Sequence, residues 1–198
     1  MNWFSLIGTI SFALSGYLIG VKKSFDLLGI IILAILTAIG GGILRDVLVN
    51  RVPLAFTDSS AIGIIFLSLL VAWLLKLHRK NDLARNQLFI VSDSIGLAAF
   101  SIAGAQVGLQ AELNLFGVLF LGFLTAVGGG IVRDMMVNDI PFILHEDFYG
   151  TVAIFIAGSL FLLKYLGATH PIWQYVLFSI GLGLRLLAHQ KAFRLPKV

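Results

Sequence analysis

Two copies of a short motif place glycines and charged side chains inside hydrophobic stretches of the sequence. Segment 37–53 recurs as segment 125–141, and eleven of the 17 positions are identical at a constant offset of 88 residues. Each copy holds three glycines and an arginine–aspartate pair, which are Gly40, Gly41, Gly42, Arg45 and Asp46 in the first and Gly128, Gly129, Gly130, Arg133 and Asp134 in the second. Backbone carbonyls and carboxylates are groups that coordinate small cations, so this motif favours ion handling.

Three consecutive glycines weaken a helix by about 1 kcal/mol each relative to alanine, and they leave nearly one turn without side chains. One interpretation is a kinked helix whose carbonyls face an aqueous lumen, because loosened backbone in a membrane is tolerated where it borders water or protein. The other interpretation is close packing of two helices through a glycine face. The two can coexist on opposite sides of one helix, and we favour the kink beside a lumen.

The charges that follow the glycines need compensation. Residues at i and i+1 do not face each other on a helix, so we expect each of these arginines and aspartates to find a partner on another helix or in solvent. Thr37 and Thr125 lie one turn before the glycines. Their hydroxyls can face a lumen or bond the carbonyl four residues earlier, and the sequence does not decide between these two.

Asp93 is a lone carboxylate about six residues into the fourth apolar stretch, which makes it a functional candidate by default. Its expected partners are Arg133 and Arg185, and the alternative is a purely structural ion pair. The equivalent position in the first copy is Ser5. The two halves are therefore expected to be electrostatically unequal.

The composition shows which elements position these groups. The 198 residues are 59% hydrophobic and 12% charged, about half the charged fraction of soluble domains, and the mean hydropathy is +0.99. A soluble fold is thereby excluded, and the absence of cysteine excludes disulfides and thiol catalysis. We predict seven transmembrane helices, each near the roughly 20 residues that cross a bilayer, at about residues 2–21, 27–49, 59–77, 87–108, 115–137, 147–166 and 172–190.

The repeat extends beyond the motif. The same offset aligns two small-residue motifs, Gly16-x-x-x-Gly20 and Gly104-x-x-x-Gly108, which predict helix contacts within a subunit or between subunits. Three spans per copy is an odd number, so the second copy enters the membrane from the opposite face. We predict an all-α membrane protein forming one domain over 1–198, with two inverted three-helix repeats at about 1–80 and 86–168 and a seventh helix at about 172–190.

Basic residues predict the orientation in the membrane. Nine lie in loops on the side of the C-terminus and two on the other side, and these are Lys22, Lys23, Lys76, Arg79, Lys80, Arg85, Lys191, Arg194 and Lys197 against Arg51 and Lys164. Cytoplasmic loops carry the excess of Lys and Arg in a cell membrane. We therefore expect a multi-pass protein of the inner membrane with its N-terminus outside and its C-terminus in the cytoplasm.

At the paired Gly-Gly-Gly-x-x-Arg-Asp motifs the sequence resembles the prokaryotic trimeric intracellular cation (TRIC) channels, whose members are also labelled glycine-transporter-like proteins. The resemblance covers nearly the whole chain. It implies a homotrimer with a pore in each subunit that conducts potassium and sodium. Bent second and fifth helices would line this pore at their glycines. We transfer only the glycines, the Arg–Asp pairs and the nearby threonines. Animal members carry a Lys–Glu type of pair at Arg45-Asp46, so their lipid regulation is not transferred.

Three functions fit these residues. In a monovalent cation channel, Asp46, Asp93 and Asp134 would bias the potential toward cations. In a secondary transporter for a small zwitterion such as glycine, the broken helices, an arginine and an aspartate would hold the substrate. A non-transporting scaffold has no evident use for the duplicated charges. The sequence holds no nucleotide loop, metal cluster or cofactor motif, so we do not expect an enzyme. The expected partners are potassium, sodium and membrane lipid, and not nucleic acid.

Overall fold

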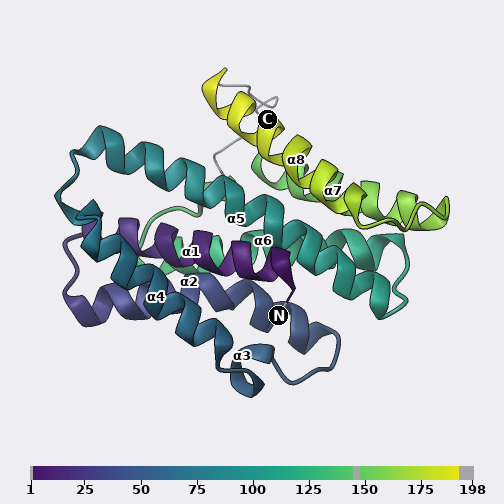
Figure 1. The fold of residues 1–198 in the computed structure, drawn as a ribbon, viewed down its shortest axis with the longest axis horizontal. Helices are drawn as coiled ribbons and strands as arrows, with labels where there is room; N and C mark the ends of the chain where they lie inside the picture. The colour runs from purple at the N-terminus through teal and green to yellow at the C-terminus, as the bar shows by residue number, and fades with distance from the viewer. Residues whose placement is uncertain (1, 145–147, 192–198) are drawn as a thin grey trace.

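The computed structural model of the chain describes residues 2–144 and 148–191, and helices make up its architecture (Figure 1). In chain order they are α1 (Trp3–Lys22), α2 (Leu27–Leu48), α3 (Leu54–Thr57), α4 (Ser60–Leu74), the 3-10 turn η1 (Leu77–Arg79), α5 (Asp82–Gln110), α6 (Leu115–Met136), the 3-10 turn η2 (Phe142–Leu144), α7 (Tyr149–Tyr165) and α8 (Ile172–Gln190).

Equivalent residues begin and end the two motif-bearing helices. Asp26 and Asn114 cap α2 and α6, and each side chain accepts a hydrogen bond from the backbone N–H of the third residue of its helix. Asn50 and Asn138 follow the other ends of these helices, and both have a φ of 55° in the left-handed region that asparagine tolerates. The duplication in the sequence is therefore also a duplication of local backbone geometry.

Four helices form the centre of the molecule. α1 packs on α2 and α5, and α6 packs on the same two helices, so the four close into a ring. α4 packs on α1 at one side, whereas α7 and α8 cover α5 at the opposite side (Figure 1). The arrangement is not fully symmetric, because α7 contacts α6 far more extensively than α4 contacts α2.

Aromatic side chains seated on glycines hold α1 against α5. Phe12 and Phe100 meet edge to face with ring centroids 5.2 Å apart, a favourable aromatic geometry. A methyl group at Gly8 would overlap the ring of Phe100, and one at Gly96 would overlap the ring of Phe12. Each phenylalanine thus fills the space that the other helix leaves at its glycine.

The predicted spans agree with the helices to within a few residues, with two differences. The helix predicted at 59–77 ends at Leu74, because Lys76 takes a left-handed conformation with a φ of 53°. The fourth predicted span begins five residues early, at Asp82, because the side chain of Asn81 caps α5 there. Arg194 and Lys197, which contribute to the predicted orientation, lie outside the described residues.

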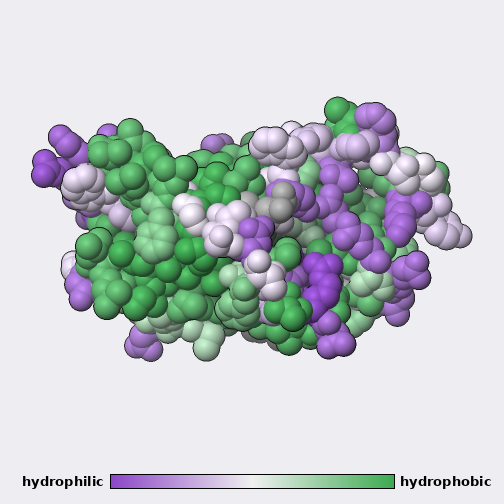
Figure 2. All heavy atoms as spheres, turned by 60° about the horizontal axis from the view of Figure 1, so that its bottom comes forward, coloured by the Kyte–Doolittle hydropathy of each residue, from purple (hydrophilic) through white to green (hydrophobic). Residues whose placement is uncertain are grey.

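The surface of the bundle is that of a membrane protein. Among the described residues, α1, α2, α5, α6 and α8 are long and apolar enough to cross a bilayer, and α4 and α7 are apolar helices of 15 and 17 residues. Large apolar side chains such as Leu28, Phe66 and Phe116 are exposed. Figure 2 shows hydrophobic residues spread broadly over one face, with hydrophilic residues gathered toward one side of it. Hydrocarbon, not water, suits such a surface.

Candidate ion pathway

At the glycine triplets α2 and α6 approach each other closely. A methyl group at Gly41 would overlap the carbonyl oxygen of Thr125, and a methyl group at Gly129 would overlap that of Thr37. The two contacts are reciprocal, since each joins one helix's glycine to the other helix's threonine carbonyl. The middle glycine of each triplet is thus required by backbone-to-backbone packing.

The helices are not interrupted at the triplets. Both α2 and α6 are α-helical through all three glycines and continue to Leu48 and Met136. The kink expected at each triplet stays a prediction. The cost of the glycines is offset because the absent side chains let the two backbones pack together. The last glycine of each triplet points elsewhere: the heavy atoms nearest a methyl group at Gly42 or Gly130 would lie 3.8 Å and 3.5 Å away.

The two threonines do not present their hydroxyls to a lumen. Thr37 donates to the Leu33 carbonyl and Thr125 to the Leu121 carbonyl, both at 2.6 Å, and both threonines are fully buried. Of the two roles left open by the sequence, the structure shows the hydrogen bond to the carbonyl four residues earlier.

The small-residue motifs are contacts within one chain. Gly16 and Gly20 lie against α2, and their repeat equivalents Gly104 and Gly108 lie against α6. A methyl group at Gly16 would come within 2.9 Å of the Thr37 hydroxyl oxygen, so this glycine also makes room for the buried threonine. The alternative of a contact between subunits is not needed to explain these four glycines.

At the end of α2, Arg45 pairs with the aspartate next to it. Its Nε lies 2.9 Å and its Nη2 2.8 Å from Asp46 Oδ1. The expectation that such neighbours cannot pair was wrong, because the long arginine side chain folds back although the Cβ atoms diverge. Asp46 Oδ2 accepts a hydrogen bond of 3.0 Å from the backbone N–H of Leu54, and Arg51 lies 3.5 Å from Oδ1. The carboxylate therefore ties α2 to the chain that follows it.

The second copy repeats this pair and extends it. Arg133 Nε lies 2.8 Å from Asp134 Oδ1, and Asp134 Oδ2 accepts a 2.8 Å bond from the N–H of Phe142. Arg133 Nη1 also lies 2.5 Å from Asp93 Oδ1 and 2.5 Å from Ser15 Oγ. One arginine thus joins α1, α5 and α6, with none of its side chain exposed. The predicted pairing of Asp93 with Arg133 is present.

Aromatic rings close the space around Arg133. Its guanidinium carbon lies 4.8 Å from the ring centre of Phe89, and that of Arg185 lies 5.0 Å from the ring centre of Tyr149. Phe142 meets both Phe89 and Tyr149 edge to face, at 5.8 and 5.6 Å. Favourable cation–π contacts of this kind hold two arginines in a buried site.

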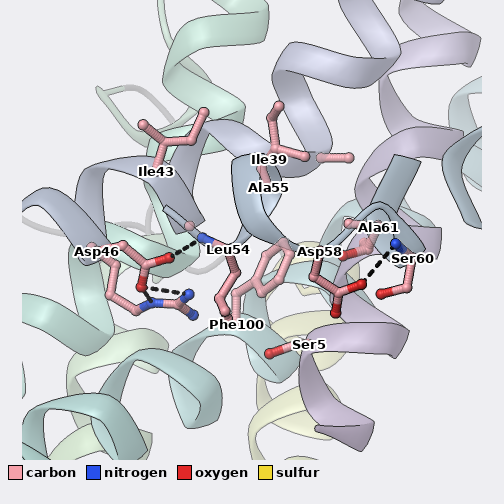
Figure 3. Close-up of a pocket in the computed structure, with 14 residues that line it drawn as sticks. Ser5, Ile39, Ile43, Asp46, Leu54, Ala55, Asp58, Ser60, Ala61 and Phe100 are labelled. Atoms are coloured by element: carbon pink, nitrogen blue, oxygen red, sulfur yellow. Dashed lines mark hydrogen bonds and ion pairs between the residues drawn. The ribbon is translucent and has the colours of Figure 1, made fainter. Parts of the chain in front are cut away.

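The first copy has a cavity at the corresponding place. It has a volume of about 60 Å³, reaches Gly42, Arg45 and Asp46, and is lined by residues of α1, α2, α3, α4 and α5 (Figure 3). Asp58 and Ser60 lie at one side of it and Leu54 at another. The backbone N–H of Ser60 donates a 2.9 Å hydrogen bond to Asp58 and lowers the pKa of that carboxyl, which keeps it charged beside the cavity.

Sequence reasoning missed the residues that distinguish these two sites, chiefly Ser15, Tyr149 and the lining positions Thr9 and Asp58. The sequence did contain a signal for Tyr149. The offset of 88 residues aligns Tyr149 with Ala61, so a large aromatic residue in the second repeat replaces a small one in the first. In the described part of the chain no three His, Asp or Glu side chains group as metal ligands would.

Comparisons with known proteins agree with this architecture. Residues 2–76 and 90–165 match the family model described as "Glycine transporter". A UPF0126 membrane protein of Deinococcus radiodurans is 38% identical over 167 residues, covering 82% of this chain and 76% of the relative.

Two solved structures have the same fold over nearly their whole length. One, from work described as "Structural basis for conductance through TRIC cation channels", has a TM-score of 0.86 and 32% identity and covers 100% of this chain and 98% of its own. The other, a prokaryotic TRIC channel crystallised in 0.5 M KCl, has a TM-score of 0.88 and 27% identity and covers 97% of this chain and 96% of its own.

Together the fold and the paired charged sites define a helical membrane protein of the TRIC channel class. The chain belongs to the prokaryotic TRIC family, the group of UPF0126 membrane proteins that the glycine-transporter model also describes.

Proposed function

We propose that this chain is a channel that passes potassium and sodium passively, with a pathway through each subunit of a homotrimer. The observation that carries the proposal is the pair of buried Arg–Asp sites on α2 and α6, on a fold shared with TRIC cation channels. Charged groups are costly in a membrane and mark ion pathways. The route runs from the cavity at Gly42, past the crossing of α2 and α6, to Arg133.

The two repeats are inverted about an axis in the membrane plane. The reciprocal contacts of Gly41 with Thr125 and of Gly129 with Thr37 support this arrangement, because a two-fold axis through the crossing would exchange them. Inverted repeats place a transport site near the midplane, where the copies meet. Each Arg–Asp pair then lies toward a different face of the membrane.

Seven helices cross the bilayer in this proposal, with the N-terminus outside. α4 and α7 have 15 and 17 residues, somewhat short of the roughly 20 that span a bilayer. Each follows a short helical turn, α3 or η2, in the chain. The remaining apolar surface contacts lipid and the neighbouring subunits.

Carboxylates along the route favour cations over anions. Asp46, Asp93 and Asp134 lie along the route, and each arginine on it is paired with a carboxylate. Pairing removes most of the repulsion that an unpaired guanidinium would exert on a passing cation. Modest selectivity between potassium and sodium follows, since no ring of carbonyls surrounds the ion at the α-helical glycine triplets.

Reconstitution in liposomes tests the proposal. Vesicles containing the purified protein should pass potassium and sodium down their gradients, without saturation by glycine, while N-methylglucamine and chloride stay behind. Protein-free vesicles are the control. Saturable, ion-coupled glycine uptake without potassium flux would replace the channel by the second candidate, a zwitterion transporter, for which the Arg45 and Asp58 charges beside one small cavity are the favouring observation.

A further inference from the structure

The cavity in the first repeat and the packed site in the second are built from equivalent positions. Seven lining positions are identical or nearly so between the copies, including Gly42 with Gly130 and Ile43 with Ile131. The other six described positions all become larger or more polar in the second repeat, and these are Ser5 to Asp93, Thr9 to Leu97, Leu54 to Phe142, Ala55 to Ile143, Ser60 to Phe148 and Ala61 to Tyr149.

The geometry of the second site shows the effect of these substitutions. The Tyr149 hydroxyl would lie 3.5 Å from a methyl group at Gly130, so the tyrosine reaches over the last glycine of its triplet. Tyr149 is 2% exposed, and Phe142 and Arg185 contact its ring. At Gly42, by contrast, Ala61 lines the cavity and leaves it empty of side chains.

We infer that the two mouths of the pathway differ by construction, with an accessible vestibule at Gly42 and a plug at Gly130 formed by Tyr149. Phe142 and Arg185 position the plug, and Asp93 holds Arg133 beside it. The assignment rests on the proposed function only in calling the route an ion pathway. The difference in access between the two glycines stands on geometry alone.

The plug contains a charged group that its closed form leaves incompletely hydrogen-bonded. Arg133 Nη2, which lies beside the Tyr149 hydroxyl at Gly130, is buried with no hydrogen-bond partner among the described residues. Such a group is costly when it is kept from water. Movement of Tyr149 would hydrate it and offset part of the lost aromatic packing, so the plug is suited to open while the rest of the bundle stays intact.

The absence of cysteine from the chain permits a direct test. Gly42→Cys and Gly130→Cys are matched positions, and both have room for a Cβ atom. In folded protein in detergent, where both mouths face solvent, we expect methyl methanethiosulfonate to modify the thiol at position 42. At position 130 it should react at least about tenfold more slowly, because a buried thiol reacts only in the fraction of molecules that open.

Two further variants assign the protection to the tyrosine ring. Tyr149→Ala in the Gly130→Cys background should raise the rate to near that of position 42, whereas Tyr149→Phe keeps the ring and should leave the thiol protected. Equal rates at the two glycines, or no acceleration by Tyr149→Ala, would overturn the inference. The size-exclusion elution volume and the thermal unfolding of each variant, compared with those of the parent protein, check that the protein is folded. If liposomes pass potassium but the thiols at positions 42 and 130 react at equal rates, the plug is overturned and the channel is not. If the thiols react at unequal rates but no potassium passes, the channel is overturned and the plug is not.

Discussion

At the scale of single residues, the buried arginines show how charge is made tolerable in an apolar bundle. Arg45 and Arg133 each bond the aspartate that follows them, and each aspartate also accepts a backbone N–H eight residues later. Each charge of these two pairs is therefore met by an opposite charge and by at least one hydrogen bond. That combination is what a buried ion pair needs to offset its desolvation.

Removing the shared arginine should be worse than removing it together with one of its carboxylates. We expect Arg133→Met to destabilise the folded protein by about 3–5 kcal/mol, since Asp93 and Asp134 then lose their buried counter-charge. The double variant Asp93→Ala with Arg133→Met should recover part of that loss, because it removes one of the two unpaired carboxylates. Thermal or denaturant unfolding of the two single variants and the double variant measures the coupling. Additive effects would show that the 2.5 Å contact carries no coupling energy.

At the scale of helices, the glycine triplets act mainly as a close-packing surface between α2 and α6. Gly41 and Gly129 face backbone of the other helix, whereas Gly42 faces the cavity beside Arg45 and Gly130 faces the Tyr149 hydroxyl beside Arg133. One triplet thus serves packing on one side and access on the other. This division explains how glycines can cluster in a helix that nevertheless stays α-helical.

Alanine at neighbouring glycines should therefore have effects of opposite sign. Gly41→Ala forces a methyl group into the Thr125 carbonyl, and overpacking of this kind typically costs about 1–3 kcal/mol. Gly42→Ala meets no atom closer than 3.8 Å, so its helix propensity should leave stability unchanged or raise it by up to about 1 kcal/mol. Thermal unfolding in detergent compares the two variants. A stable Gly41→Ala protein would contradict the close approach of the helices.

At the scale of the whole molecule, the duplicated units give a ring of four helices with one open and one packed end. α4 leaves the cavity beside α2, while α7 lies firmly on α6 and α8 adds Arg185 from outside the repeats. The extra helix thus contributes to only one of the two ends. In the inverted arrangement proposed above, these unequal ends would present different chemistry to the two sides of the membrane.

The proposed orientation can be checked in intact bacteria, again because the chain has no cysteine. A cysteine at Thr169, in the exposed turn after α7, should react with a membrane-impermeant maleimide added outside the cells. One at Lys80, in the turn before α5, should react only after permeabilisation, because the basic loops remain in the cytoplasm. The reverse pattern would invert the proposed topology.

Much of this protein was determined by its sequence alone. Hydropathy located seven apolar helices to within a few residues, since bilayer thickness and N-terminal capping set their lengths. The offset of 88 residues identified the two units and the residues that carry charge. These features are local or periodic, and they do not depend on how the helices pack.

Only the tertiary structure decided what faces what. Whether a glycine meets a backbone or a cavity, and whether Thr37 turns its hydroxyl to its own helix, depends on rotations about helix axes that hydropathy does not resolve. The fold-back of Arg45 onto Asp46 depends on side-chain length rather than on helical spacing. Tyr149 closes one end because α7 packs on α6, and no local pattern specifies which side chains meet where these two helices pack.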